Sequence, residues 1–189
     1  MWQEGIRAGI MQPQFHGREH LNLHIFNDKL QKRDAQLLTA LKNRSYTSIS
    51  DDDYPQHSST AAYDFYDPIE LEPMKENLRD GLARFEQVYG YKSDYFTPPV
   101  YHIHHSLFST LLENGVKFID LDLVRNEHQG FGKFKREFNY TGKKTPEGLH
   151  VMVRNVVFEP TEDRGLDWTA FALKQIEAAF RWNRPAIIS

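Results

Sequence analysis

The chain has 189 residues, a formal net charge of −3 at neutral pH and no cysteine. This length predicts a single domain over 1–189 with one core. Without cysteine, disulfides, thiolate metal sites and cysteine nucleophiles are excluded, so any metal ion must be held by His, Asp or Glu. No cluster of Lys or Arg offers a phosphate-binding surface, and no apolar run reaches the ~20 residues of a membrane span. We therefore expect neither a nucleic-acid partner nor a membrane segment, and a cytoplasmic location by default, because charges interrupt residues 1–10 where a signal peptide would be apolar.

The first third of the chain predicts short elements around a histidine-containing corner. Residues 2–10 have a helical pattern, 11–15 are extended, and a strand-to-helix corner follows at His16 and Gly17. From Glu19 to Leu41, apolar residues at helical spacing predict a helix that is interrupted near Asp34. The polar stretch 43–60 has no periodicity and is predicted to be a loop.

The middle of the chain predicts alternating strands and helices. An extended segment over 61–66 precedes a strongly amphipathic helix over 71–88, which Gly90 ends. A short strand over 95–97, a helix over 106–114 and a strand over 116–124 follow.

The last third predicts a β-hairpin and a final helix and strand. Segments 134–140 and 149–158 flank a glycine-containing turn, which predicts a β-hairpin insertion near 132–158. Asp167 is expected to cap a helix, and 185–188 to form a strand. The tryptophans Trp2, Trp168 and Trp182 are expected in the core. This alternation predicts an α/β fold, in which functional groups collect at the carboxyl ends of parallel strands.

His16 and His20 are the first candidate metal ligands. If residues from Gly17 onward are helical, the two side chains lie on one face with Cβ atoms ~5–6 Å apart. Two imidazoles at that spacing can share one ion at ~2.1 Å from each nitrogen. The chain has nine histidines, and His20 and His24 form a second pair at this spacing, so a chance pairing stays open on spacing alone.

The segment 13–22, with the sequence PQFHGREHLN, resembles the histidine motif of the polysaccharide deacetylase family, carbohydrate esterase family four. Further similar segments follow in order along nearly the whole chain. Residues 96–99 resemble the substrate-groove segment of the family, 115–119 the next strand, and 154–160 and 184–189 late segments of a bacterial subgroup. The resemblance implies part of a distorted (β/α) barrel with His16 and His20 as ligands of a divalent ion. It also implies a metal-dependent hydrolase that cleaves the C–N amide bond of N-acetylated sugars.

The resemblance also indicates what lies outside this chain. Family members typically begin with a strand ending in two aspartates, one a general base and the other a metal ligand, and carry a later histidine as the presumed general acid. This chain begins after that strand and ends before that histidine, so we expect a fragment whose catalytic residues stay unassigned. Asp120 and Asp122, two apart in a predicted strand, share a face and could add ligands, or could be solvated or capping carboxylates. Residues 51–53, all Asp, are expected in a solvated loop.

The expected substrate groove consists of Phe96, Pro98, Pro99, Tyr101 and His102. The Tyr101 ring could stack on a sugar. His102, His104 and His105 could line the groove, where a histidine could act as an acid or base, or they could be surface histidines at the start of a helix. Zinc suits two imidazoles plus a carboxylate best, with nickel, cobalt and manganese left open. Arg154 and Glu159 are expected to be structural charges.

Two other functions remain open. A member of the same fold could bind carbohydrate or a protein partner without turnover, or a histidine-rich metal-binding protein could have an unrelated fold. The open strand edges of an incomplete barrel favour pairing between copies, so a homo-oligomer is also an expectation.

Overall fold

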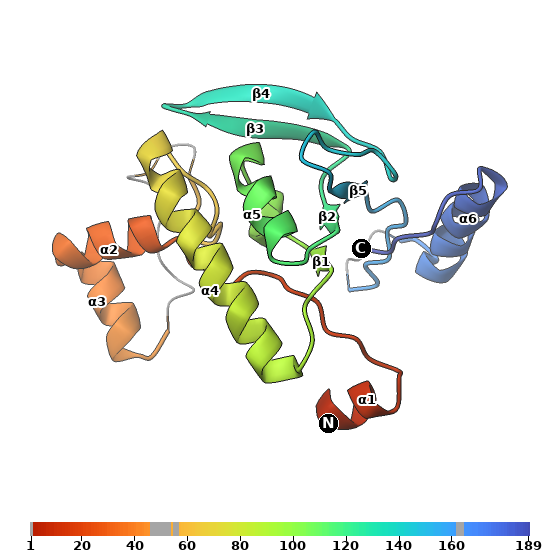
Figure 1. The fold of residues 1–189 in the computed structure, drawn as a ribbon, viewed down its shortest axis with the longest axis horizontal. Helices are drawn as coiled ribbons and strands as arrows, with labels where there is room; N and C mark the ends of the chain where they lie inside the picture. The colour runs from red at the N-terminus through yellow and green to blue at the C-terminus, as the bar shows by residue number, and fades with distance from the viewer. Residues whose placement is uncertain (1, 46–53, 55–56, 162–164) are drawn as a thin grey trace.

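The computed structural model describes residues 2–45, 54, 57–161 and 165–189 (Figure 1). The helices, in chain order, are α1 (Trp2–Arg7), α2 (Leu23–Gln31), α3 (Ala35–Lys42), η1 (Pro68–Glu70), α4 (Leu71–Tyr89), η2 (Pro99–Tyr101), η3 (His105–Leu107), α5 (Phe108–Glu113) and α6 (Trp168–Arg181). The strands are β1 (Tyr95–Phe96), β2 (Phe118–Asp120), β3 (Val124–Gly130), β4 (Lys133–Phe138) and β5 (His150–Met152).

A short parallel sheet forms the centre of the molecule. Its strand order is β1-β2-β5, and Phe15 extends it through a parallel bridge to Phe96. The register aligns four residues, each at most 3% exposed: Phe15, Phe96, Ile119 and Val151. Burial of such a row stabilises the sheet by removing apolar surface from water. The described residues form a mixed α and β structure with two small sheets, neither of which closes into a barrel.

Helix α4 packs against this core, as its amphipathic pattern predicts. Leu78 is fully buried on it, and Gly90 ends it in the left-handed conformation, with φ +79°. Gly81 allows the close approach of the central sheet, because a Cβ at this position would lie 2.8 Å from Cζ of Phe15. In Figure 1, α4 lies beside α5, with α2 and α3 on one side of them and α6 at the opposite end.

The hairpin is displaced from its predicted position. Antiparallel pairing joins β3 to β4, whereas β5 returns to the central sheet beside β2. A turn does occur near 145–149, where Thr145 N donates to Leu149 O at 2.8 Å, but β4 and β5 do not pair across it. The predicted hairpin insertion near 132–158 was therefore wrong in its pairing, because the strand expected over 134–140 pairs with β3 and not with residues 149–158. Polar residues that are buried in β3, Arg125 and Glu127, obscured the strand pattern in the sequence.

Helix starts are set by capping side chains. Asn22 caps α2 by accepting from Ile25 N at 3.1 Å, Asp34 caps α3, and Asp167 caps α6. The predicted interruption near Asp34 and the predicted cap at Asp167 are confirmed. The prediction that Gly17 begins a helix was wrong, because residues 16–22 are irregular.

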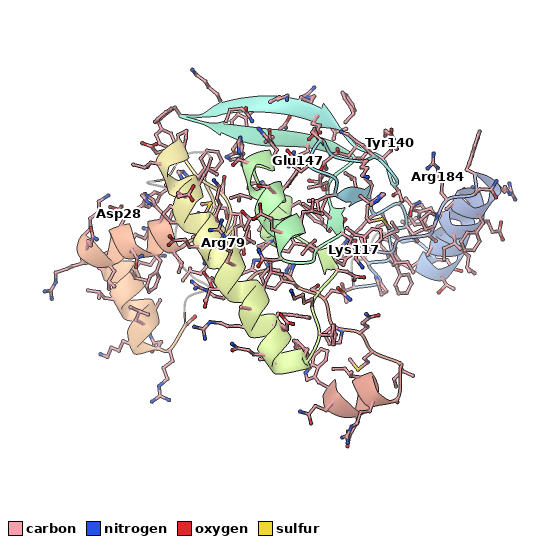
Figure 2. The ribbon with its side chains drawn as sticks, in the orientation of Figure 1. Asp28, Arg79, Lys117, Tyr140, Glu147 and Arg184 are labelled. Atoms are coloured by element: carbon pink, nitrogen blue, oxygen red, sulfur yellow. The ribbon has the colours of Figure 1, made fainter. Side chains whose placement is uncertain are left out.

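The structure also bears on the predictions for the tryptophans, for residues 61–66 and for membrane-spanning helices. Trp168 is buried, but Trp2 is 53% and Trp182 is 80% exposed, so two of the three expected core tryptophans lie at the surface. The strand or extended segment expected over 61–66 contains a turn and no strand, and it is buried except at Ala62, which is partly buried, and Tyr66, which is exposed. Asp28 on α2 and Arg184 beyond α6 lie toward opposite ends of the view in Figure 2. Within the described ranges, no helix combines the length and apolar character needed to cross a bilayer.

Candidate functional site

Polar residues gather at the carboxyl edge of the central sheet. His16 follows Phe15, Thr97 follows Phe96, and Asp120 ends β2 after Ile119. Because Phe15, Phe96 and Ile119 share one register row, the three polar residues occupy the next row. In a parallel sheet this edge is where ligands commonly bind.

The imidazoles of His16 and His20 face each other at this edge. Their Nε2 atoms are 2.9 Å apart. Nδ1 of His16 lies 2.7 Å from the carbonyl oxygen of Thr97, and Nδ1 of His20 lies 2.9 Å from that of Thr60. Both side chains are exposed, so solvent reaches the pair.

These contacts define which ring nitrogens carry protons. A carbonyl oxygen only accepts hydrogen bonds, so Nδ1 of each ring carries the hydrogen and Nε2 of each neutral ring presents a lone pair. Two lone pairs facing each other at 2.9 Å repel unless a proton or a cation lies between them. Two nitrogens ~2.1 Å from one ion would be about 3.0–3.4 Å apart at angles of 90–109°. The pair therefore fits a divalent metal, with its outer nitrogens oriented by backbone carbonyls as in many metal sites.

A sharp loop, and not a helix, brings the two histidines together. Gly17 has φ +100°, a conformation that disfavours side chains. A Cβ at Gly17 would lie 3.2 Å from both Glu19 O and Pro99 Cγ. The loop thus packs directly on the Pro98-Pro99 segment, beside which the groove was expected.

Only part of the expected groove is accessible. Phe96 is fully buried and stacks on Phe15 at 5.4 Å between ring centroids, so its assignment to substrate binding was wrong. Pro98 and Pro99 are also buried and support the loop.

The two residues that follow the prolines have a strained backbone conformation. Val100 has φ 55° and Tyr101 has φ 58°, values that are rare for residues other than glycine. Tyr101 and His102 are half-buried. One face of the Tyr101 ring is covered by Arg154, whose Cζ lies 5.3 Å from the ring centroid.

Asp120 and Asp122 do not share a face. The strand ends at Asp120, which is 1% exposed, whereas Asp122 is exposed. Oδ2 of Asp120 accepts from Nε of Arg154 at 2.8 Å, and its Oδ1 is buried without a hydrogen-bond partner. Burial raises the pKa of Asp120, and the nearby Arg154 only partly opposes it. Among the described residues, no carboxylate or third imidazole lies within 4.8 Å of both His16 and His20 nitrogens.

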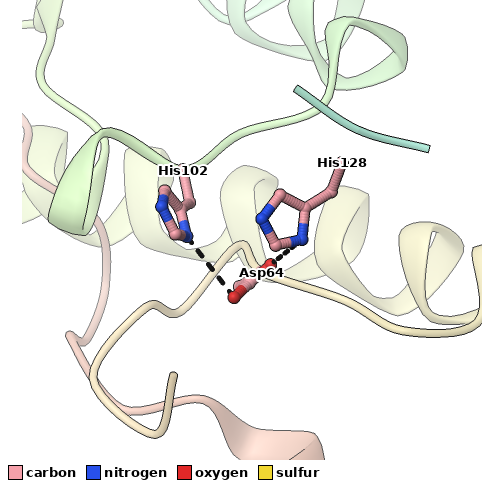
Figure 3. A group of neighbouring side chains, drawn as sticks. All are labelled: Asp64, His102 and His128. Carbon is pink, nitrogen blue, oxygen red and sulfur yellow. Dashed lines mark ion pairs between the residues drawn. The ribbon is translucent and has the colours of Figure 1, made fainter. Parts of the chain in front are cut away.

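A second group of titratable side chains was not predicted as a unit. Asp64 is 1% exposed, and its carboxylate lies 2.7 Å from Nδ1 of His128 and 3.4 Å from Nδ1 of His102 (Figure 3). Burial, the largest single influence, raises the pKa of Asp64, but the two histidines together lower it to about 2. The signal in the sequence was a charged residue between two aromatic residues, Tyr63 and Phe65. Both aromatic side chains are buried in the structure.

The remaining candidates have other surroundings. His24, the other member of the second histidine pair, lies 3.6 Å from Glu70 on the surface of α2. Arg154 pairs with Asp120, so its predicted structural role agrees with the contacts. The Asp residues at 51–53 lie outside the described residues. No protein-family model matches the chain, and comparisons with curated proteins and with solved structures gave no match.

Proposed function

We propose that this chain is part of a metal-dependent hydrolase of the carbohydrate deacetylase type, acting on the C–N amide bond of N-acetylated sugars. The observation that carries the proposal is the His16 and His20 pair, whose Nε2 atoms converge while Thr97 and Thr60 fix the opposite nitrogens. The resemblance of segment 13–22 to the deacetylase histidine motif supports the choice of reaction.

Each residue in this proposal has a limited role. His16 and His20 would hold a divalent ion, for which zinc is the best match to imidazole ligands. A bound ion of this kind polarises the acyl carbonyl and lowers the pKa of a bound water. Tyr101 and His102 would line the approach to the pair, because both follow the proline segment on which the His16 loop packs. The general acid and base remain unassigned.

A second function is favoured by one specific observation. Within the described residues the pair lacks a nearby carboxylate, which a zinc hydrolase of this type would be expected to supply. A protein that binds carbohydrate or another protein at this edge without turnover would not need that carboxylate.

Acetate release separates the two functions. The assay would use oligomers of N-acetylglucosamine with added zinc, and compare the chain with a His16→Ala, His20→Ala variant and a His24→Ala control. The proposal predicts zinc-dependent release that the double variant loses and the control keeps. Sugar binding without release would support the non-catalytic function, and release that survives in the double variant would contradict the assigned site.

A further inference from the structure

We propose that Asp64, His102 and His128 form a second divalent-metal site, separate from the His16 and His20 pair. This inference does not depend on the hydrolase proposal, because it rests on different side chains. The three residues come from different parts of the chain: a buried turn, the segment after η2, and strand β3.

The geometry places three donor atoms around one point. The Asp64 carboxylate lies between the two rings, whose centroids are 5.0 Å apart (Figure 3). One ligand atom from each residue lies within 4.8 Å of the other two. A zinc ion ~2.0–2.2 Å from each donor would need donor separations of about 3.0–3.6 Å. The 3.4 Å between His102 and Asp64 lies in that range, whereas Nδ1 of His128, 2.7 Å from Asp64, would have to move outward to admit an ion.

Backbone groups orient the Asp64 carboxylate, whereas two imidazole nitrogens near it make no hydrogen bond. The backbone N–H groups of Phe65 and Ser58 donate to the two Asp64 oxygens at 3.0 and 3.1 Å, which fixes the carboxylate orientation. Nδ1 of His102 is buried and makes no hydrogen bond, and its contact is the 3.4 Å ion pair with the Asp64 carboxylate. Nε2 of His57 is also buried without a hydrogen bond. His57 interacts electrostatically with Asp64 and His128. Buried polar atoms without a hydrogen bond are unusual, and a place for a water molecule or an ion is one of their physical explanations.

The site has room for one ion and a route to solvent. The cavity lined by these residues has a volume of about 10 Å³, close to the space that one water-sized particle occupies. The His102 side chain is 36% exposed, so the cavity reaches the surface on its side. Two imidazoles and one carboxylate leave the fourth position of a tetrahedral ion open. Catalytic zinc sites have that arrangement, whereas structural zinc sites are closed by four protein ligands.

A neighbouring cluster lacks these properties and serves as a control. His104, His105 and Glu127 also bring three donors within 4.8 Å. However, the guanidinium of Arg125 lies 2.9 Å from the Glu127 carboxylate, which also accepts from the backbone N–H of His105. This carboxylate already has a cation beside it, and Arg125 would repel a metal ion.

Calorimetric titration with zinc chloride tests the proposal in a His16→Ala, His20→Ala background, which removes the other candidate site. The background variant should still bind one zinc per chain. Adding His102→Ala should weaken this site by ~100-fold or more, since loss of even an outer partner of a metal ligand costs 10–100-fold. Adding His105→Ala should leave the affinity unchanged. No zinc binding in the background, or binding that His102→Ala does not alter, would overturn the proposal.

A second measurement does not depend on the folding of a variant. X-ray absorption at the zinc edge of the loaded background variant should show two imidazole ligands and one carboxylate. A first shell with one imidazole or none would overturn the proposal.

Discussion

Nε2 of His16 and Nε2 of His20 face each other at a distance of 2.9 Å. The arrangement is assembled from distant parts of the chain, because the carbonyl oxygens that hold the rings belong to Thr97 and Thr60. Those two backbone segments also lead to His102 and Asp64, the ligands proposed for the second site. The two candidate sites therefore depend on the same two loops.

Gly81 on α4 should control the position of His16 through Phe15. In Gly81→Ala, the new Cβ would lie 2.8 Å from the Phe15 ring. Helix propensity favours alanine by ~1 kcal/mol, but overpacking costs ~1–3 kcal/mol, so we expect a net loss of about 1 kcal/mol in unfolding free energy. We also expect several-fold weaker zinc binding at His16 and His20. Urea unfolding and calorimetry measure the two effects.

Ala83→Gly is the matched control on the exposed face of the same helix. It should cost ~1 kcal/mol through propensity alone and leave zinc binding unchanged. A Gly81→Ala variant that is more stable than the original chain and binds zinc equally well would show that α4 does not constrain the histidine loop.

The ion pair between Arg154 and Asp120 should stabilise the carboxyl edge of the sheet. Arg154→Met leaves the Asp120 carboxylate buried without its partner, which should cost ~2 kcal/mol in urea unfolding. Arg181→Met is the control, because its partner Glu177 lies 3.7 Å away and both side chains are exposed. That change should cost less than ~0.5 kcal/mol. Equal losses in the two variants would contradict a special role for the buried pair.

The unfolding free energy of the chain should depend on pH because of the buried Asp120 carboxyl group. Its folded pKa is raised, chiefly by burial, above the ~3.9 of an unfolded aspartate. As pH rises above ~4, the unfolded state loses this proton first, so the folded state binds more protons and the unfolding free energy falls. The unfolding free energy of the original chain minus that of Asp120→Asn should therefore decline from pH 4 upward. A difference that grows over this range would mean that the folded pKa is depressed.

The sequence was sufficient where structure depends on local pattern. The apolar spacing along 71–88 predicted α4, and Asp167 predicted the start of α6, because helical periodicity and capping act over a few residues. The alternation of strands and helices also predicted that functional groups would collect at the carboxyl ends of parallel strands, where His16 and Asp120 lie in the structure.

Contacts between distant segments could not be predicted in the same way. His16 and His20 were expected on one helix face, but an irregular loop and two remote carbonyl groups bring them together. Asp64 and His128 are 64 residues apart in the chain and no local pattern relates them, so their contact at 2.7 Å appears only in the folded molecule. The assignment of Phe96 to the groove failed because a short strand turns this side chain into the core.

The central claim is that His16 and His20 bind a divalent metal ion, and zinc titration of the metal-free chain tests it most directly. The comparison is between the original chain, His16→Ala with His20→Ala, and the surface control His24→Ala. We expect the double variant to bind one zinc fewer per chain than the original, and His24→Ala to match the original in number and affinity. Equal zinc stoichiometry and affinity in all three proteins would contradict the assignment of the metal to His16 and His20.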